Sequence, residues 1–203
     1  MEEITYKIRI DFIEPILGSQ PTKNVASTYI AQKAGLPGLP EDEEADLPEM
    51  LERGTTVFHR HIFVPGCEPE PALVDYQVKG FLKAAAHVYN GQINGIKALK
   101  SKVENLVFVS PRFIQIKSDK DKVIQVDKLE RSLRAQTAQG DRVALAISEM
   151  IPAGCYIEGG ITVLGDTISQ EVLEKLFDYG LYKGIGQWRN GGYGRFRYSL
   201  VME

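Results

Sequence analysis

Apolar and polar residues alternate between Thr5 and Ile13, so that every second side chain is apolar. Such alternation is typical of a strand with one buried face, and a strand is predicted over 4–13. In Asp75–Tyr89 the apolar residues instead recur every three or four positions, which predicts an amphipathic helix that ends before Asn90-Gly91. The same patterns predict strands over 105–117, 155–164 and 193–201, and a second helix over 169–182 with Ser169 as its N-cap.

The order of these six elements is β-α-β-β-α-β, which is the order of the ferredoxin-like fold. The prediction is an α+β protein, a single domain over 1–203, with an antiparallel sheet and both helices on one face. Two insertions, at about 18–66 and 118–150, interrupt this unit. Their weaker patterns predict a helix over 22–34, a surface loop over 36–48, strands over 55–64, 122–126 and 143–147, and a polar connection over 129–142.

The composition narrows the class of protein. The 203 residues are 43% hydrophobic and 25% charged, as in ordinary globular proteins. No apolar run approaches the roughly 20 residues that span a bilayer, and the acidic start Met1-Glu2-Glu3 differs from a signal peptide. A cytoplasmic protein without a membrane partner is therefore expected. The two cysteines have no metal-ligand spacing, and the pair His59-x-His61 has no nearby Asp, Glu or Cys to complete a site, so neither a metal nor a cofactor is expected.

The charge is unevenly distributed, although the net charge is only −3. Residues 36–54 hold seven acidic residues and one arginine, whereas 71–140 hold twelve basic and six acidic residues. Residues 175–197 hold five basic residues and one aspartate. One acidic segment thus masks two basic regions, which permits a nucleic-acid partner without requiring one.

The segment Lys183–Arg197 reads K-G-I-G-Q-W-R-N-G-G-Y-G-R-F-R and contains five glycines between a helix and a strand. Exposed backbone N–H groups in such a loop can hold phosphate oxygens, arginines add forked donors, and aromatic rings stack on bases. The segment lacks the Gly-Lys-Ser/Thr ending of a P-loop, and it follows a helix, unlike a Rossmann fingerprint. The alternative is a tight connection with Trp188 as a core plug.

This segment resembles the C-terminal glycine-rich loop of the RAMP superfamily, the RNA-binding proteins of CRISPR systems. Three further stretches are similar to landmarks of that family in the same order: Glu14–Ser19, Val74–Ala85 and Ile151–Glu158. The resemblance is closest to stand-alone RAMP-like proteins of phages and integrated elements. It implies a ferredoxin-like fold and an RNA partner.

The catalytic residues of the family do not map onto this chain. Its processing endoribonucleases use a histidine, often with a tyrosine or a lysine, and its backbone subunits cut with a loop aspartate. His59 and His61 are weak catalytic candidates, because the sequence shows no partner that would position either of them. The sequence therefore favours a protein without enzymatic activity, although it leaves such an activity open.

The predicted RNA-binding residues fall in three segments. Lys79 and Lys83 share one helical face, where the alternative is an ordinary solvated surface. Arg131 and Arg134 belong to the polar connection, where an exposed loop is the equal alternative. The glycine-rich segment supplies Gly184, Gly186, Trp188, Arg189, Gly191, Gly192, Tyr193, Gly194 and Arg195.

The leading interpretation is a non-catalytic protein that holds single-stranded RNA by backbone and stacking contacts against the sheet and this loop. One alternative is a protein-interaction module of a phage or mobile element, which assembles on or interferes with a host nucleoprotein complex. A second alternative is a metal-independent endoribonuclease. The oligomeric state and the preferred RNA sequence do not follow from the sequence.

Overall fold

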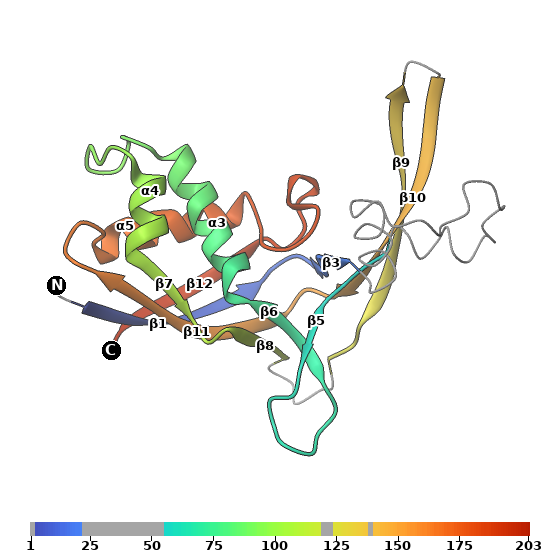
Figure 1. Cartoon of the computed structure of the whole chain (residues 1–203), viewed down its shortest axis with the longest axis horizontal. Helices are drawn as coiled ribbons and strands as arrows, with labels where there is room; N and C mark the ends of the chain where they lie inside the picture. Colours follow the sequence, from blue (N-terminus) through green and yellow to red (C-terminus); the bar gives the residue numbers. More distant parts are fainter. Residues whose placement is uncertain (1–2, 22–54, 119–123, 138–139) are drawn as a thin grey trace, which may run out of the picture.

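The computed structural model of the chain describes residues 3–21, 55–118, 124–137 and 140–203, with side chains for all of these except 133–137 and 140–144 (Figure 1). The predicted helix over 22–34, the predicted loop over 36–48 and the acidic segment lie outside the described residues. The architecture is α+β: the described residues form two sheets, and their helices cover one face of the larger sheet.

The larger sheet contains the four strands that the sequence predicts most clearly. Its order is β12-β1-β11-β8-β6-β5, and β7 also pairs with β11. These strands are β1 (Glu3–Phe12), β5 (His59–His61), β6 (Glu70–Val74), β7 (Val107–Ser110), β8 (Phe113–Ser118), β11 (Cys155–Leu164) and β12 (Phe196–Met202). All of their pairings are antiparallel. The first and last strands are neighbours, so the two ends of the chain lie close together (Figure 1).

In the described part of the chain, three α-helices pack on one face of this sheet: α3 (Asp75–Val88), α4 (Leu99–Leu106) and α5 (Gln170–Asp178), which continues as the 3-10 turn η1 (Tyr179–Leu181). Helix α3 begins where the side chain of Gln77 accepts a hydrogen bond from the Val74 N–H at 2.8 Å. Ser169 has the extended backbone of an N-cap, but its side chain makes no capping hydrogen bond. The helix predictions over 75–89 and 169–182 are confirmed to within a few residues at each end.

The core lies between the helices and the sheet, and aromatic rings fill its centre. Phe81 of α3 is fully buried and contacts Phe196 of β12 edge-on, with ring centroids 5.0 Å apart. The Phe177 ring stacks on Phe81 at 6.3 Å. Each such ring contributes about 1.5–3 kcal/mol by leaving water. This packing joins both helices to the last strand, which directly follows the glycine-rich loop.

The smaller sheet is assembled from the two predicted insertions and from the residues just before the first of them. Its order is β2-β10-β4-β3, with β9 paired to β10. The strands are β2 (Ile16–Leu17), β3 (Gln20–Pro21), β4 (Thr55–Val57), β9 (Asp127–Thr137) and β10 (Gly140–Ile151). The β4–β10 pairing is parallel, and the others are antiparallel. Strands β9 and β10 form a hairpin that projects from the body of the protein (Figure 1).

Several predicted elements are wrong in detail. The polar connection over 129–142 is a paired hairpin, and residues 124–126 of the predicted strand over 122–126 are not in a strand. The strand predicted over 105–117 begins inside α4 and is broken between Ser110 and Phe113 into β7 and β8. The strand predicted over 55–64 ends at His61, after a break at Phe58. The last strand begins at Phe196 rather than at 193, because the glycine-rich loop extends through Arg195.

Candidate nucleic-acid interface

Backbone hydrogen bonds attach the glycine-rich loop to the segment that follows the first strand. The Gly194 N–H donates to the Pro15 carbonyl at 2.8 Å, and the Gln187 N–H donates to the Leu17 carbonyl at 3.3 Å. The Ile185 N–H donates to the Gly194 carbonyl at 3.0 Å, which closes the loop on itself. These amides are therefore used inside the protein. The loop presents fewer free N–H groups to an anion than its sequence indicates.

The five glycines of the loop fall into two groups. A Cβ atom on Gly184 would lie 2.2 Å from the Gly194 carbonyl carbon, and one on Gly194 would lie 1.9 Å from the Ile185 oxygen. A Cβ atom on Gly186 would lie 2.8 Å from the Leu17 oxygen. These three glycines allow the chain to approach itself closely.

Gly191 and Gly192 have more space around them. The nearest atom to a Cβ on Gly191 would be the Arg131 guanidinium at 3.5 Å, and the nearest to one on Gly192 would be Arg195 Nε at 3.7 Å. Gly192 has a φ of +86°, which favours glycine for its backbone conformation alone. Close packing against the body therefore explains Gly184, Gly186 and Gly194, but not this second group.

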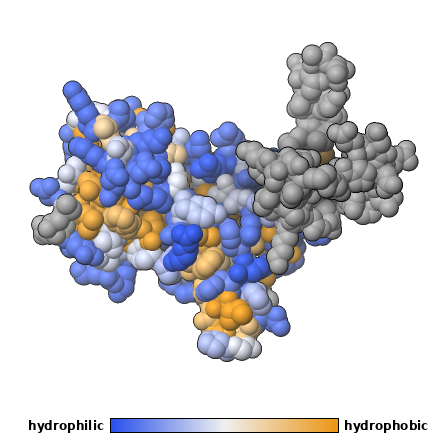
Figure 2. Space-filling model, in the orientation of Figure 1, coloured by the Kyte–Doolittle hydropathy of each residue, from blue (hydrophilic) through white to orange (hydrophobic). Residues whose placement is uncertain are grey.

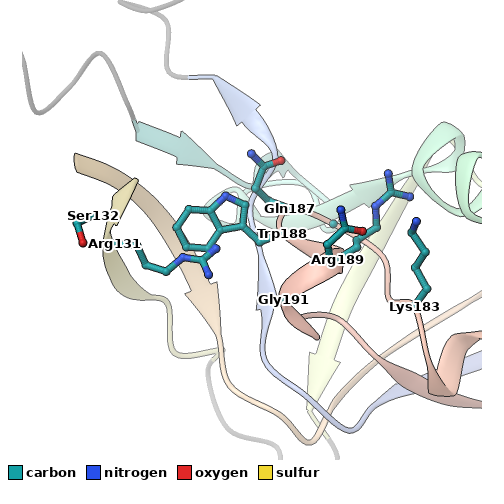
Figure 3. A pocket seen from close by; sticks show the side chains of 9 residues that line it. Arg131, Ser132, Lys183, Gln187, Trp188, Arg189 and Gly191 are labelled. Atoms are coloured by element: carbon teal, nitrogen blue, oxygen red, sulfur yellow. The ribbon is translucent and has the colours of Figure 1, made fainter. Parts of the chain in front are cut away.

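A groove of about 550 Å³ runs between the loop and strand β9 (Figure 3). Its lining contains three cationic side chains and an indole ring, and no carboxylate. The lining residues are Arg131, Ser132, Lys183, Gly186, Gln187, Trp188, Arg189, Asn190 and Gly191. Arg131 comes from β9, whereas Lys183 and Arg189 lie on the other side of Trp188 (Figure 3). Positive charge thus flanks an aromatic ring on both sides.

Arg131 and Trp188 are in direct contact. The guanidinium of Arg131 lies over the Trp188 ring, and it is 5.3 Å from the Tyr193 ring centroid. Burial lowers the pKa of Arg131, and the nearby Tyr193 partly opposes this. Arg131 Nε is buried without a hydrogen-bond acceptor among the described residues. Trp188 has a left-handed backbone, with φ of +58°, which is costly for a residue with a side chain.

The other predicted RNA-binding residues of the loop and of β9 have structural partners or have side chains outside the described residues. Arg195 forms an ion pair with Glu14 at 2.6 Å, and its carbonyl accepts from the Ile13 N–H at 2.9 Å. Arg195 is thus engaged with the end of β1. Tyr193 contacts Trp188 edge-on, with ring centroids 6.3 Å apart. The side chain of Arg134 is outside the described residues.

Lys79 and Lys83 do not line this groove. Lys79 Nζ donates to the Val107 carbonyl, and Lys83 pairs with Glu104 at 2.5 Å. Burial, and then the charge of Lys83, lower the pKa of Lys79. Both lysines line a separate hollow of about 400 Å³ beside α3, together with Tyr76, Gly80, Ala84, His87 and Lys100. The structure therefore does not bring the three predicted segments into one site.

The face of the large sheet that is turned away from the helices is rich in charge, and Arg9 and Lys117 on this face have acidic partners. Arg9 pairs with Asp11 at 2.9 Å and lies 3.7 Å above the ring of Tyr156. Lys117 pairs with Glu158 at 2.9 Å. An RNA strand on this face would have to compete with these ion pairs. The groove beside the glycine-rich loop has no such competition among its lining residues.

The two histidines lie together at the edge strand β5. His59 Nε2 is 3.1 Å from the Tyr76 hydroxyl, so His59 has the partner that the sequence did not reveal. Burial, and then the charge of Arg112, lower the pKa of His59. His61 stacks on Phe113, with ring centroids 4.5 Å apart. Within the described part of the chain, no three His, Cys, Asp or Glu side chains are grouped to hold a metal ion.

The turn between β5 and β6 carries an apolar patch on the protein surface. Ile62 is 51% exposed and Val64 is 59% exposed. Apolar surface is visible on this part of the molecule in Figure 2. The patch lies next to the edge of the large sheet and outside the groove at the glycine-rich loop.

Sequence reasoning missed Ser132, Lys183, Gln187 and Asn190, which also line the groove. Three of these lie in or beside the glycine-rich segment, where adjacency alone could have indicated them. The contact between Arg131 and Trp188 could not be inferred in this way, since 56 positions separate the two residues in the chain.

Comparison with solved structures places the fold among chains of CRISPR assemblies. A chain of a Type IV-B CRISPR complex superposes with a TM-score of 0.50 at 10% sequence identity, over 98% of this chain and 90% of that chain. A chain of the Type III-B Cmr-beta complex bound to cognate target RNA has a TM-score of 0.49 at 11% identity. That match covers 98% of this chain and 61% of the other chain.

No family model and no curated protein matches the sequence. Among the described residues, no helix is long and apolar enough to cross a membrane. What the comparisons establish is a likeness of fold to a chain of the Type IV-B CRISPR complex.

Proposed function

We propose that this chain is a RAMP-like RNA-binding protein of the cytoplasm that holds single-stranded RNA in the groove between β9 and the glycine-rich loop. The carrying observation is the composition of that groove, which has three cations and a tryptophan but no carboxylate. Cations bind phosphates, and an aromatic ring stacks on any base, so such a groove suits a single strand without regard to sequence. The likeness of fold to a chain of a CRISPR complex is consistent with this assignment.

The strand order supports the finer part of the proposal. Reading β7 and β8 as one interrupted strand, the sheet order β12-β1-β11-β7/β8 is the fourth, first, third and second strand of a β-α-β-β-α-β unit. From that arrangement, with α3 and α5 as the two connecting helices, we infer a ferredoxin-like topology. We infer a single RAMP-like domain over 1–203, in which the smaller sheet is an elaboration of this unit.

The RNA-binding residues that we propose are fewer than the sequence indicates. Arg131, Lys183 and Arg189 would contact phosphates, and Trp188 would contact a base. Gly184, Gly186, Gly194 and Arg195 would shape the loop, because close packing and an ion pair already account for them. Lys79 and Lys83 lie in a separate hollow and would at most contact a distant part of a long RNA.

The test is the affinity of the protein for a labelled, unstructured RNA, measured by fluorescence anisotropy at fixed salt. Lys183→Gln/Arg189→Gln should weaken binding by about tenfold or more per lost phosphate contact. The matched control is Lys97→Gln/Lys175→Gln, which removes the same charge from exposed or partly exposed positions outside the groove. Equal affinity of the two folded double variants would reject the groove as the RNA site.

A metal-independent endoribonuclease is a second candidate, because His59 lies 3.1 Å from the Tyr76 hydroxyl. A neutral histidine can act as a general base, and a lowered pKa keeps it neutral. Incubation of labelled RNA with the protein in chelator tests this candidate, with His59→Ala and Tyr76→Phe as variants. Cleavage that both changes reduce would support it, whereas intact RNA would leave binding as the activity.

The protein-interaction alternative is favoured by the exposed Ile62 and Val64 of the turn between β5 and β6. Contiguous exposed apolar surface is typical of sites where proteins bind one another. On this alternative the wild-type protein would show no RNA affinity in the anisotropy measurement. Ile62→Ser/Val64→Ser would then reduce its recovery within a nucleoprotein complex.

A further inference from the structure

Arg131 occupies an unusual position in the unliganded protein. Its guanidinium covers the Trp188 ring, while no carboxylate lines the surrounding groove. Its Nε is buried and lacks an acceptor among the described residues. Buried polar atoms are nearly always hydrogen-bonded. An anion next to Arg131 would supply the acceptor that its Nε lacks.

The ring beneath Arg131 is equally unusual. Trp188 holds a left-handed backbone conformation that only glycine adopts freely, and such conformations concentrate at functional sites. The indole remains partly exposed in the groove and is not a core plug. A planar guanidinium stacks on an aromatic face in much the same way as a nucleobase does. Arg131 therefore occupies the place where a base would stack.

We propose that an unpaired nucleobase takes the face of Trp188 that Arg131 covers, and that the displaced guanidinium of Arg131 binds the adjacent phosphate. This inference rests on the proposed function and specifies its ligand as a single strand with accessible bases. The exchange gives the base an aromatic platform, and it gives Arg131 the acceptor that it lacks. Arg131 thus covers the Trp188 ring in the absence of RNA and binds a phosphate when RNA is present. A duplex, whose bases are paired and stacked, would not make this exchange.

The test compares a single-stranded RNA with an abasic backbone of the same length and charge. Both present the same phosphates, so a groove that reads only charge binds them equally. Stacking of one base should make the RNA bind about 5- to 150-fold more tightly, from about 1–3 kcal/mol per base. The chain contains one tryptophan, so its intrinsic fluorescence reports on Trp188 alone. That fluorescence should change with the RNA and not with the abasic backbone.

Two variants at Trp188 separate the effect of aromatic stacking from the effect of a large apolar side chain. Trp188→Leu keeps an apolar side chain without an aromatic face and should bind both ligands equally, whereas Trp188→Phe should retain part of the preference. Arg131→Ala should make the unliganded Trp188 more accessible to acrylamide quenching, because the guanidinium no longer covers it. A melting curve for each variant checks folding, and the comparison of the two ligands on the wild type requires no variant.

The outcomes are distinguishable. Equal affinity for RNA and abasic backbone, without a change in fluorescence, would overturn the stacking proposal and leave a phosphate-binding groove. Quenching that is the same in the wild type and in Arg131→Ala would show that Arg131 does not cover the ring. Absence of binding to either ligand would overturn the proposed function itself, and the stacking proposal with it.

Discussion

Replacement of Gly194 by alanine should destabilise the protein far more than the same change at Gly192. Both glycines have a positive φ, of +69° at Gly194 and +86° at Gly192, so an alanine costs about 1–2 kcal/mol at either position. They differ in the space around them. A Cβ on Gly194 would lie 1.9 Å from the Ile185 oxygen, whereas the nearest atom to a Cβ on Gly192 is 3.7 Å away.

The clash at Gly194 is with backbone, which cannot rotate away. The loop must therefore move, and the bonds from Gly194 N–H to Pro15 and from Ile185 N–H to Gly194 are then lost or lengthened. Two hydrogen bonds contribute about 1 kcal/mol each. Gly194→Ala should thus cost about 3–4 kcal/mol. Gly192→Ala should cost about 1–2 kcal/mol, and the matched pair isolates the effect of close packing.

The assay is urea unfolding, together with a thermal melt of each variant. A difference of about 2 kcal/mol corresponds to about 4–8 °C in Tm for a chain of this size. If Gly194→Ala and Gly192→Ala have the same free energy of unfolding, the loop is not packed as described. The division of its glycines into structural and exposed groups would then be wrong.

Three further predictions concern single side chains. Burial raises the pKa of the Cys155 thiol to about 12, so at pH 8 a thiol reagent should label Cys67 rapidly and Cys155 only after unfolding; rapid labelling of both would contradict this. Burial is the main cause that lowers the pKa of His59 in the folded protein from its ordinary value of 6.5. As the pH falls below 6.5, the unfolded chain therefore binds a proton at His59 before the folded protein does, and the free energy of unfolding decreases. His59→Gln should reduce the difference in the free energy of unfolding between pH 5 and pH 7, measured by denaturation, and an unchanged difference would be evidence against this reasoning. Glu14→Gln breaks the half-exposed pair with Arg195 and should cost less than about 1 kcal/mol in the same assay, and a larger loss would show that the pair holds the loop.

The best-predicted elements are those with one fully buried face. Strand β11 was predicted with its observed bounds, and α3 to within one residue at its end, because regular apolar positions pack on a core. Helix α4 is absent from the prediction, although its apolar residues Leu99, Val103 and Leu106 have helical spacing. The strand predicted over 105–117 includes the last of these three, which leaves only two apolar positions for a helix. The break in the strand over 105–117 could have been suspected at Pro111.

The candidate site includes a residue of β9, a strand whose alternating apolar pattern is obscured by its many charged and polar residues. In β9, Leu129 and Leu133 stand at alternate positions, and Arg131 lies between them in the same register. The arginines and glutamines of this segment outnumber its apolar residues, and this composition favours a polar loop. The signal that could have been used is an arginine at an apolar position of an alternating strand. Its contact with Trp188 arises from the tertiary fold and has no local sequence signal.

The most direct test of the RNA-binding proposal is the salt dependence of affinity for a single-stranded RNA. The logarithm of the binding constant should fall linearly with the logarithm of the salt concentration in the wild type. In Lys183→Gln/Arg189→Gln the slope should be smaller by about 1.4, from about 0.7 for each lost phosphate contact. It should be unchanged in Lys97→Gln/Lys175→Gln. A wild-type affinity that does not depend on salt, or equal slopes in all three proteins, would contradict the assignment of this groove to RNA.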